Sequence, residues 1–374
     1  MVRRTVRALG SAVGVSGLVA AGLTGVAAGP AVANGVATDV VASGLNSPRQ
    51  VSFGPDGALY VAEAGKGGNG PCVDSPEGNV CFGFSGSVTK VMNGRQSRVL
   101  RGLPSLAGEG GVSGAGPSDI VVGSGGTYAL TMNLGNNPAV RDDLPAAGHK
   151  FGTVLMGRFG GGPVTIADLA SFEAAKDFDG QGPDSNPTSL LKDGSSYVVA
   201  DAGANTLMRV RARGKMAKMA LFENRLVPAP PFLPPGDIPM QPVPTAVAKG
   251  PDGAFYVSEL TGFPFPAGQA RIYRVKPGQA PTVWASGLTN VTDIAWVGNS
   301  LLAVQIAGSG GLLSVPPGEL PTGNVVVVDR WGPPLELVGG LTAPYGLAVK
   351  GSTAYVSTCT VCAGGGQVVS FSLN

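Results

Sequence analysis

Histidine and charged residues are scarce in this 374-residue sequence, and their scarcity argues against several classes of function. His149 is the only histidine, so no multi-histidine metal site can form, and a Ser-His-Asp triad would depend on His149 itself. No Gly-x-Ser-x-Gly motif supplies such a serine, and no Gly-rich loop continues into the Lys-Ser/Thr of a phosphate-binding loop. Charged residues make up 13% of the chain and the basic ones are scattered, which disfavours nucleic-acid binding.

Long apolar runs are also scarce, and the only one lies at residues 8–29. Three arginines precede it and an Ala-Val-Ala site ending at Ala33 follows it, which is typical of a secretory signal peptide. Gly and Ala dominate the run and Pro30 ends it, which disfavours a transmembrane anchor. We therefore predict a signal peptide at 1–33, by general secretion rather than twin-arginine export, and a secreted mature chain without a membrane span. Losing three arginines changes the net charge from +2 to −1.

The four cysteines form two local pairs, Cys72 with Cys81 and Cys359 with Cys362. Cysteines in an exported chain favour disulfides, although four cysteines allow three pairings that the sequence alone does not distinguish. The Cys-x-x-Cys spacing at 359–362 leaves two alternatives, a redox-active pair and a four-thiolate zinc site. The zinc site is disfavoured because eight residues lie between the two cysteines of the other pair.

What the sequence has in abundance is glycine, proline and repetition, with 60 Gly and 31 Pro. The segment PDGALYVAEAG at 55–65 combines an Asp-Gly turn, a short apolar strand and an acid. Related segments recur at 123–133, 192–203, 251–259, 298–305 and 350–358. A unit that repeats about every 55 residues cannot bury its faces alone, so the sequence predicts a closed array of repeats.

Each repeat predicts a four-stranded antiparallel unit, and the chain is therefore expected to be an all-β, six-bladed β-propeller. The expected blades span about 46–102, 117–169, 187–222, 244–285, 291–338 and 344–373. The last unit has three predicted strands, whereas the strand at 36–45 has no unit of its own. We expect this N-terminal strand to pair with residues 367–373 and close the ring, which protects the sheet edges.

Strand direction divides the connections between two ends of the ring. Short turns such as Pro55-Asp56-Gly57 and Pro251-Asp252-Gly253 lie at one end, here the turn face. All long connections lie at the other end, here the insertion face: 66–85, 104–116, 135–150, 171–186, 223–243, 261–269 and 307–322. Long loops gathered at one end of a rigid scaffold usually carry function, so we expect binding at the insertion face.

Two sets of polar residues are expected near the mouth of the central channel on the insertion face. The first occupies one phase of the repeat, where each second strand ends: Glu63, Asn133, Asp201, Glu259, Gln305 and Thr358. The second occupies the entrances of the innermost strands: Arg49, Gln50, Asp119, Thr188, Ser189, Thr245, Asp293 and Tyr345. A ring of oxygen atoms suits Ca²⁺, whereas an acid at a strand end commonly accepts backbone N–H bonds and fixes its turn. The structural role is favoured, and no catalytic residue is assigned.

Several stretches resemble the ScyD/ScyE family of exported bacterial proteins over about residues 36–374. They include VVASGLNSPRQVSFGPDGALYVAEAGKGG at 40–68, YVVADAGANTLMRV at 197–210 and PTAVAKGPDGAFYVSEL at 244–260. The resemblance implies a propeller related to NHL-repeat proteins and supplies no catalytic residue. More distantly, the chain is similar to gluconolactonase-like propellers, which implies a divalent cation near Asn133, Asp201 and Glu259. Quinoprotein sugar dehydrogenases are similar in outline, but their histidine base has only His149 as a counterpart.

We therefore expect an exported, monomeric binding or scaffold protein that takes a small-molecule or protein ligand on its insertion face. The alternative is a metal-dependent hydrolase of the lactonase type with a cation at the channel mouth. The sequence does not identify the ligand.

Overall fold

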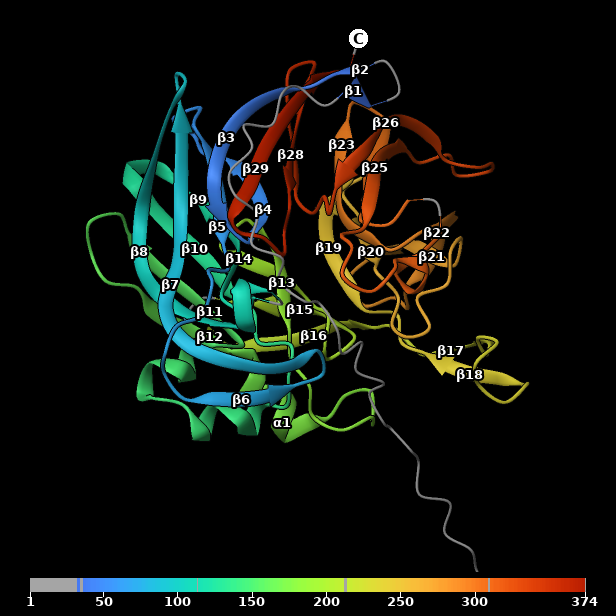
Figure 1. The fold of residues 1–374 in the computed structure, drawn as a ribbon, viewed down its shortest axis with the longest axis horizontal. Helices are drawn as coiled ribbons and strands as arrows, with labels where there is room; N and C mark the ends of the chain where they lie inside the picture. The colour runs from blue at the N-terminus through green and yellow to red at the C-terminus, as the bar shows by residue number, and fades with distance from the viewer. Residues whose placement is uncertain (1–31, 34–35, 113, 212–213, 309, 374) are drawn as a thin grey trace, which may run out of the picture.

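Six four-stranded antiparallel sheets form the blades of a β-propeller (Figure 1). The computed structural model describes residues 32–33, 36–112, 114–211, 214–308 and 310–373. The innermost strands contact one another in the order β4, β9, β13, β19, β23, β27 and back to β4, which closes the ring. The predicted all-β, six-bladed fold is confirmed.

The first three blades run outward from the channel in chain order. Blade 1 contains β4 (Pro48–Phe53), β5 (Leu59–Glu63), β7 (Gly78–Met92) and β8 (Arg95–Ala107). Blade 2 contains β9 (Pro117–Val122), β10 (Thr127–Met132), β11 (Thr153–Arg158) and β12 (Val164–Asp168). Blade 3 contains β13 (Pro187–Asp193), β14 (Ser196–Asp201), β15 (Thr206–Val210) and β16 (Met216–Leu221).

The other three blades repeat this order, except that the last one takes its outermost strand from the N-terminal region. Blade 4 contains β19 (Pro244–Lys249), β20 (Phe255–Glu259), β21 (Ala270–Val275) and β22 (Thr282–Leu288). Blade 5 contains β23 (Val291–Val297), β24 (Ser300–Gln305), β25 (Thr322–Val327) and β26 (Leu335–Thr342). Blade 6 contains β27 (Leu347–Lys350), β28 (Thr353–Thr358), β29 (Ala363–Ser372) and β3 (Asp39–Asn46).

The pairing of β3 with β29 closes the ring as the sequence predicts. Ala42 lies opposite Val368 and Val40 opposite Val369, so strands from the two ends of the chain share one sheet. Figure 1 shows this junction as blue β3 beside red β29. The expected signal peptide lies outside the described residues except for Val32–Ala33, which forms β1 and pairs with β2 (Val36–Ala37). No helix among the described residues is long and apolar enough to span a membrane.

The hydrophobic core is divided among the six interfaces between neighbouring blades. One apolar cluster fills each interface. Each cluster contains a fully buried aliphatic residue. Going round the ring from the interface of blades 1 and 2 to that of blades 6 and 1, these residues are Leu130, Val199, Val257, Ile272, Val304 and Val61. Burying one such side chain stabilises the fold by about 1.5–3 kcal/mol. The blades are therefore held mainly by their flat faces, which leaves the loops at both ends free to vary.

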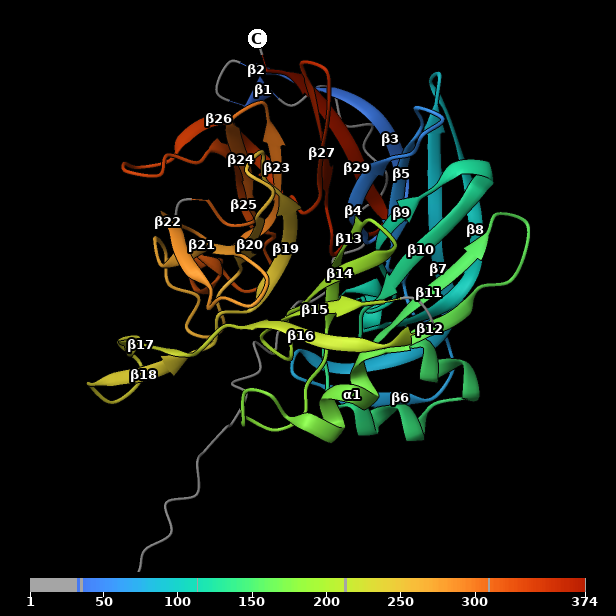
Figure 2. The same cartoon turned by 180° about the vertical axis from the view of Figure 1, so that it is seen from behind.

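The insertions build structure that has no counterpart in the repeat. β6 (Cys72–Ser75) pairs with the first part of β7, and α1 (Leu169–Lys176) follows β12. The Pro-rich connection before blade 4, expected to be extended, forms the hairpin β17 (Arg225–Pro228) and β18 (Asp237–Met240). This hairpin projects from the body of the ring in Figures 1 and 2. Short 3-10 helices complete the connections: η1 (Glu109–Gly111), η2 (Ser124–Gly126), η3 (Pro138–Asp143), η4 (Ala146–Lys150) and η6 (Leu312–Ser314).

Both predicted disulfides are present. Cys72 bonds to Cys81 across the β6–β7 hairpin, where the two residues lie directly opposite each other. Cys359 bonds to Cys362 in the connection between β28 and β29. No free cysteine is found among the described residues, which include all four, so a thiolate zinc site is excluded in this state.

Candidate functional site

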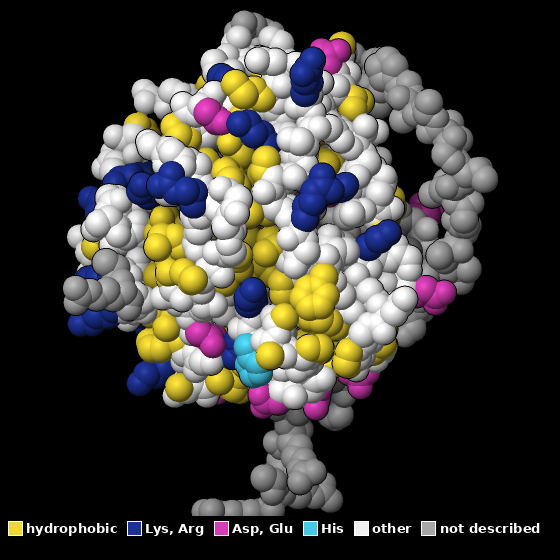
Figure 3. Space-filling view, turned by 90° about the vertical axis from the view of Figure 1, so that its left-hand side faces the viewer, with side chains coloured by type: hydrophobic (Ala, Val, Ile, Leu, Met, Phe, Trp, Pro, Cys, Tyr) yellow, Lys and Arg dark blue, Asp and Glu magenta, His cyan; other side chains and the backbone are white. Residues whose placement is uncertain are grey.

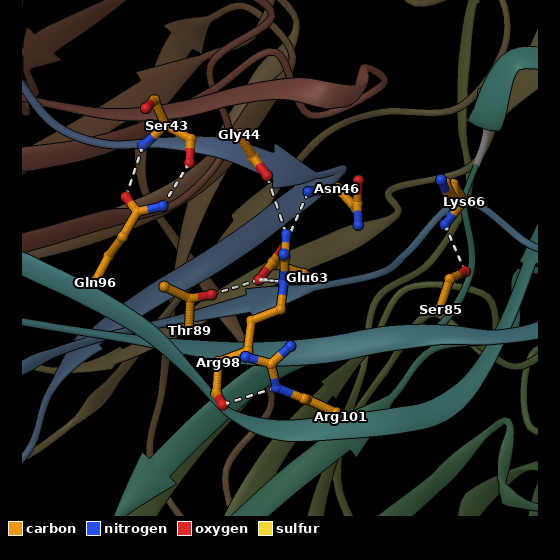
Figure 4. Close-up of polar contacts among 10 residues, drawn as sticks. All are labelled: Ser43, Gly44, Asn46, Glu63, Lys66, Ser85, Thr89, Gln96, Arg98 and Arg101. Atoms are coloured by element: carbon orange, nitrogen blue, oxygen red, sulfur yellow. Dashed lines mark hydrogen bonds and ion pairs between the residues drawn. The ribbon is translucent and has the colours of Figure 1, made fainter.

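Glu63, the first of the repeated polar residues, is fully buried and fully engaged by neighbouring donors. Its Oε2 accepts from the Asn46 backbone N–H at 2.8 Å and from Arg98 Nη2 at 2.7 Å. Its Oε1 accepts from the Thr89 hydroxyl at 2.5 Å and from Arg98 Nε at 3.0 Å. Figure 4 shows the carboxylate between these groups, which come from β3, β7 and β8. Glu63 therefore fastens the closing strand to blade 1.

Asn133, Asp201 and Gln305 repeat one part of this arrangement. Each side-chain oxygen accepts the N–H of a residue just before the innermost strand of its own blade. The donors are Gly116 at 2.6 Å for Asn133, Asn186 at 2.6 Å for Asp201 and Thr289 at 2.6 Å for Gln305. Asp201 also accepts from the Ser185 hydroxyl at 2.8 Å through its other oxygen. These three residues occupy the same position in the repeat, and a side-chain oxygen of each accepts the same hydrogen bond from a backbone N–H.

The reason for this link lies at the start of the innermost strands. In several blades the first residue of that strand is a proline paired with the repeated polar residue: Pro48 with Glu63, Pro187 with Asp201 and Pro244 with Glu259. Because proline has no N–H, the sheet lacks a donor at this point. At Pro48 and Pro187 the polar side chain instead accepts a backbone N–H from just before the proline. In all three blades the register shifts by a β-bulge directly afterwards.

Glu259 is also fully buried but uses a different partner. Arg225 on β17 donates to its two oxygens at 2.5 and 2.9 Å, and the Arg271 backbone N–H donates at 3.0 Å. This pair ties the projecting β17–β18 hairpin to blade 4. Asn133, Asp201 and Glu259 are thus each engaged with their own surroundings, and their oxygens do not form an open cation site. They do not fit the divalent cation that a lactonase-type site requires.

Asp119 and Asp293, from the innermost strands, link neighbouring blades. Each is 8% exposed. Asp119 accepts the Leu190 N–H of blade 3 at 2.7 Å, and Asp293 accepts the Leu347 N–H of blade 6 at 2.6 Å. Burial raises the pKa of Asp119 to about 7 and that of Asp293 well above its ordinary range, against the effect of these hydrogen bonds. Burial therefore favours the protonated form of both aspartates.

Arg49, another of the predicted site residues, supports the insertion face. Its Nη1 donates to the Thr360 hydroxyl at 3.0 Å and its Nη2 to the Gly114 carbonyl at 2.5 Å. Its guanidinium carbon lies 5.1 Å from the centre of the Tyr345 ring. Arg49 thus holds two connections of the insertion face against the channel.

The insertions themselves form a cavity that involves none of the predicted site residues. Its volume is about 280 Å³. It is lined by Pro76, Asn136, Asn137, Asp179, Gln181, Gly182, Pro183, Asp184, Gly203 and Gln241. These residues come from the four insertions 66–85, 135–150, 171–186 and 223–243, with Gly203 added from blade 3. Sequence reasoning located the insertions but missed the residues, because an insertion has no repeated counterpart with which to align it.

Comparisons with known proteins support the fold. No protein-family model matches the chain, and no curated protein sequence is significantly similar to it. A solved gluconolactonase candidate has a TM-score of 0.51 and 12% identity, covering 91% of this chain and 92% of that one. The PQQ-bound aldose sugar dehydrogenase of Streptomyces coelicolor has a TM-score of 0.49 and 13% identity, covering 90% and 97%. Virginiamycin B lyase of Staphylococcus aureus has a TM-score of 0.49 and 11% identity, covering 90% and 99%. At 12% identity, the likeness to the gluconolactonase candidate shows the β-propeller fold alone.

Proposed function

We propose that this chain is an exported binding protein of the ScyD/ScyE type that takes its ligand on the insertion face. The convergence of four insertions on one cavity carries the proposal. Insertions that arise in different blades have no structural need to meet, since each blade packs through its flat faces. Two disulfides hold connections at this end of the ring, which pre-organises the face for binding.

The chemistry of the cavity indicates the kind of ligand. Its polar side chains are amides and carboxylates, including Asn137, Gln181, Gln241, Asp179 and Asp184, and no Lys or Arg is found among its described lining residues. Such a lining accepts hydrogen bonds and disfavours phosphates and carboxylates, which need basic partners. The volume is close to the lower limit of about 300 Å³ for small-molecule sites. The cavity suits a small ligand, or the tip of a larger one, that carries hydroxyl or ammonium groups.

A lactonase-type activity lacks a specific observation in its favour. The oxygens that would hold its cation are bonded to backbone N–H groups or to Arg225. We therefore assign no catalytic residue.

To test the proposal, the chain from residue 34 onward is titrated with a panel of monosaccharides, disaccharides and small amines. Binding is measured by NMR or calorimetry. Gln241→Trp narrows the cavity and should weaken binding of any active probe at least tenfold. Gln279→Trp makes the same change at an exposed position of the turn face and should leave binding unchanged. The proposal fails if no probe in the panel binds, or if the two variants bind alike.

A further inference from the structure

Three carboxylates converge at the end of α1, in the insertion that precedes blade 3. One oxygen from each of Glu173, Asp177 and Asp179 lies within 4.8 Å of the others. Oxygens bound to one Ca²⁺ at about 2.3–2.6 Å lie no more than about 5 Å apart, so a single ion can contact all three. Figure 1 places α1 at the lower edge of the molecule, and acidic side chains gather along the lower edge of the surface in Figure 3.

The cluster contains buried carboxylate oxygens that lack a donor. Glu173 is 2% exposed, and its only hydrogen bond among the described residues runs from the Phe178 N–H to Oε1 at 3.2 Å. Its second oxygen accepts no hydrogen bond from a described residue, and the carboxylate lies close to those of Asp177 and Asp179. Asp184, which feels the negative charge of Asp179, has a wholly buried Oδ1 that accepts no hydrogen bond from a described residue. Buried polar atoms are rarely left unsatisfied, so Asp184 Oδ1 in particular indicates a further ligand.

None of the Lys or Arg side chains that the structure describes supplies that ligand. Within the described part of the chain, no Lys or Arg forms an ion pair with Glu173, Asp177, Asp179 or Asp184. Burial first, and then the charge of Asp201, raise the pKa of Glu173 to about 7 and that of Asp184 to about 6. Lys218 lies over the Phe178 ring at 4.5 Å rather than in an ion pair with one of these carboxylates. The cluster therefore concentrates negative charge that the fold leaves uncompensated.

The local sequence has the spacing of a calcium-binding loop. Residues 177–182, DFDGQG, place oxygen-bearing side chains at positions 1, 3 and 5 and glycine at position 6. Gly182 has a φ of +97°, which favours glycine, and its N–H donates to Asp177 Oδ1 at 3.2 Å. Position 12 of such a loop is normally Glu, but here it is Thr188, which lies in β13. The buried carboxylate of Glu173, one helical turn before the loop, takes its place.

We propose that Glu173, Asp177 and Asp179 bind a calcium ion, with Asp184 and Gln181 beside it. An all-oxygen site with several carboxylates suits Ca²⁺, whereas zinc prefers His and Cys. The ion neutralises the cluster and fixes the loop 177–184 against blade 3. Because Asp179 and Asp184 also line the insertion-face cavity, calcium orders one wall of it. The ion binds whether or not the cavity takes a ligand, so the two proposals fail independently.

Calorimetric titration of the metal-stripped chain with CaCl₂ at pH 7.5 tests the site. We expect one saturable site, with a dissociation constant of about 10⁻⁴–10⁻³ M, as in extracellular calcium modules. Calcium at about 100 times this constant should raise the melting temperature by about 3–6 °C, and the same concentration of MgCl₂ should raise it less. An absence of saturable heat up to about 100 times this constant, or a melting temperature unchanged by calcium and chelator, overturns the proposal.

Matched variants assign the site to these residues. Asp179→Asn removes one charge and keeps an oxygen for the Gln181 N–H that Asp179 accepts at 2.9 Å, but it loses the bond from Asn205 Nδ2 at 2.8 Å. It should weaken calcium binding at least tenfold. Asp177→Asn provides a second variant with the same expectation in case the first one fails to fold. Asp56→Asn makes the same change on the turn face and should bind calcium like the wild type. If Asp179→Asn and Asp177→Asn bind calcium normally, the ion lies elsewhere and the proposal is wrong.

Discussion

Acidic side chains at the two ends of the ring lie in opposite electrostatic surroundings. On the turn face, Asp56 pairs with Lys90 at 2.7 Å, Asp193 with Lys249 at 2.6 Å and Asp252 with Arg274. Burial would raise the pKa of Asp56, but its bonds from Lys90 and Tyr60 lower it overall. On the insertion face, burial and neighbouring acids raise the pKa of Glu173 to about 7.

The difference separates two uses of the same residue type. A carboxylate with its own Lys or Arg holds a turn or a strand, and its charge is already balanced. A cluster of carboxylates without such a partner destabilises the fold unless a proton or a cation neutralises it. Glu63 is an informative exception, because it is buried near the insertion face and yet has Arg98 as its counter-ion.

Arg98→Met should have the largest effect, because it turns Glu63 into a buried acid without a counter-ion. Breaking one partner of a buried pair costs about 3–5 kcal/mol, and we expect about 3 kcal/mol because Arg98 is partly exposed. Urea denaturation at pH 7.5 measures the loss. Arg101→Met, on the same strand but without an acidic partner, is the control. A loss below about 1 kcal/mol for Arg98→Met would show that the counter-ion is not what holds Glu63.

The pH dependence of stability should expose the unbalanced acids of the insertion face. Without calcium, we expect the free energy of unfolding to fall by about 2 kcal/mol between pH 5 and pH 8. The sign follows from raised folded-state pKa values: the stabilisation is complete below the unfolded value of about 4 and is lost as Glu173 and Asp184 ionise near pH 7 and 6. Asp119 acts in the same direction.

Urea denaturation in chelator at several pH values measures this fall, and Glu173→Gln separates the contribution of the insertion face from that of Asp119. The variant should flatten the profile in part, and saturating calcium should do the same to the wild type. A wild-type profile that is flat or rises between pH 5 and pH 8 would contradict the proposed charge imbalance.

Asp56→Asn should have the smallest effect, because the pair of Asp56 with Lys90 is partly exposed. Such surface pairs contribute less than about 1 kcal/mol. The lowered pKa of Asp56 means that its stabilisation is present above the unfolded value and is lost only as the pH falls through the lower folded value. The urea midpoint of the variant should therefore differ from the wild type by a nearly constant amount between pH 5 and pH 8. A difference that grows across this range would refute the contrast between the two faces.

The fold was largely predictable because the repeat encodes it. The Asp-Gly turns and the strands after them mark the blades, and the unpaired strand 36–45 indicates the closure that β3 and β29 form. The repeat phase also located Glu63 and Asp201 at strand ends. Their partners were not predictable, because Arg98 and Ser185 come from strands and loops whose positions only the assembled blade defines.

The candidate site was less predictable because insertions are not repeats. The helix α1, the β17–β18 hairpin and the cavity depend on contacts between loops of different blades. The spacing of Asp177, Asp179 and Gln181 before Gly182 was a local signal for a cation, but the repeat pattern drew attention to Asn133 and Glu259 instead. Residues outside the repeat phase therefore carry most of the proposed function.

The central claim is that the acids at the end of α1 are balanced by calcium. A crystal structure of the chain grown with CaCl₂, examined for the anomalous signal of calcium, tests it most directly. We predict one peak with oxygens of Glu173, Asp177 and Asp179 at about 2.3–2.6 Å. The absence of a peak there, with a Lys or Arg side chain against the carboxylates instead, would contradict the account.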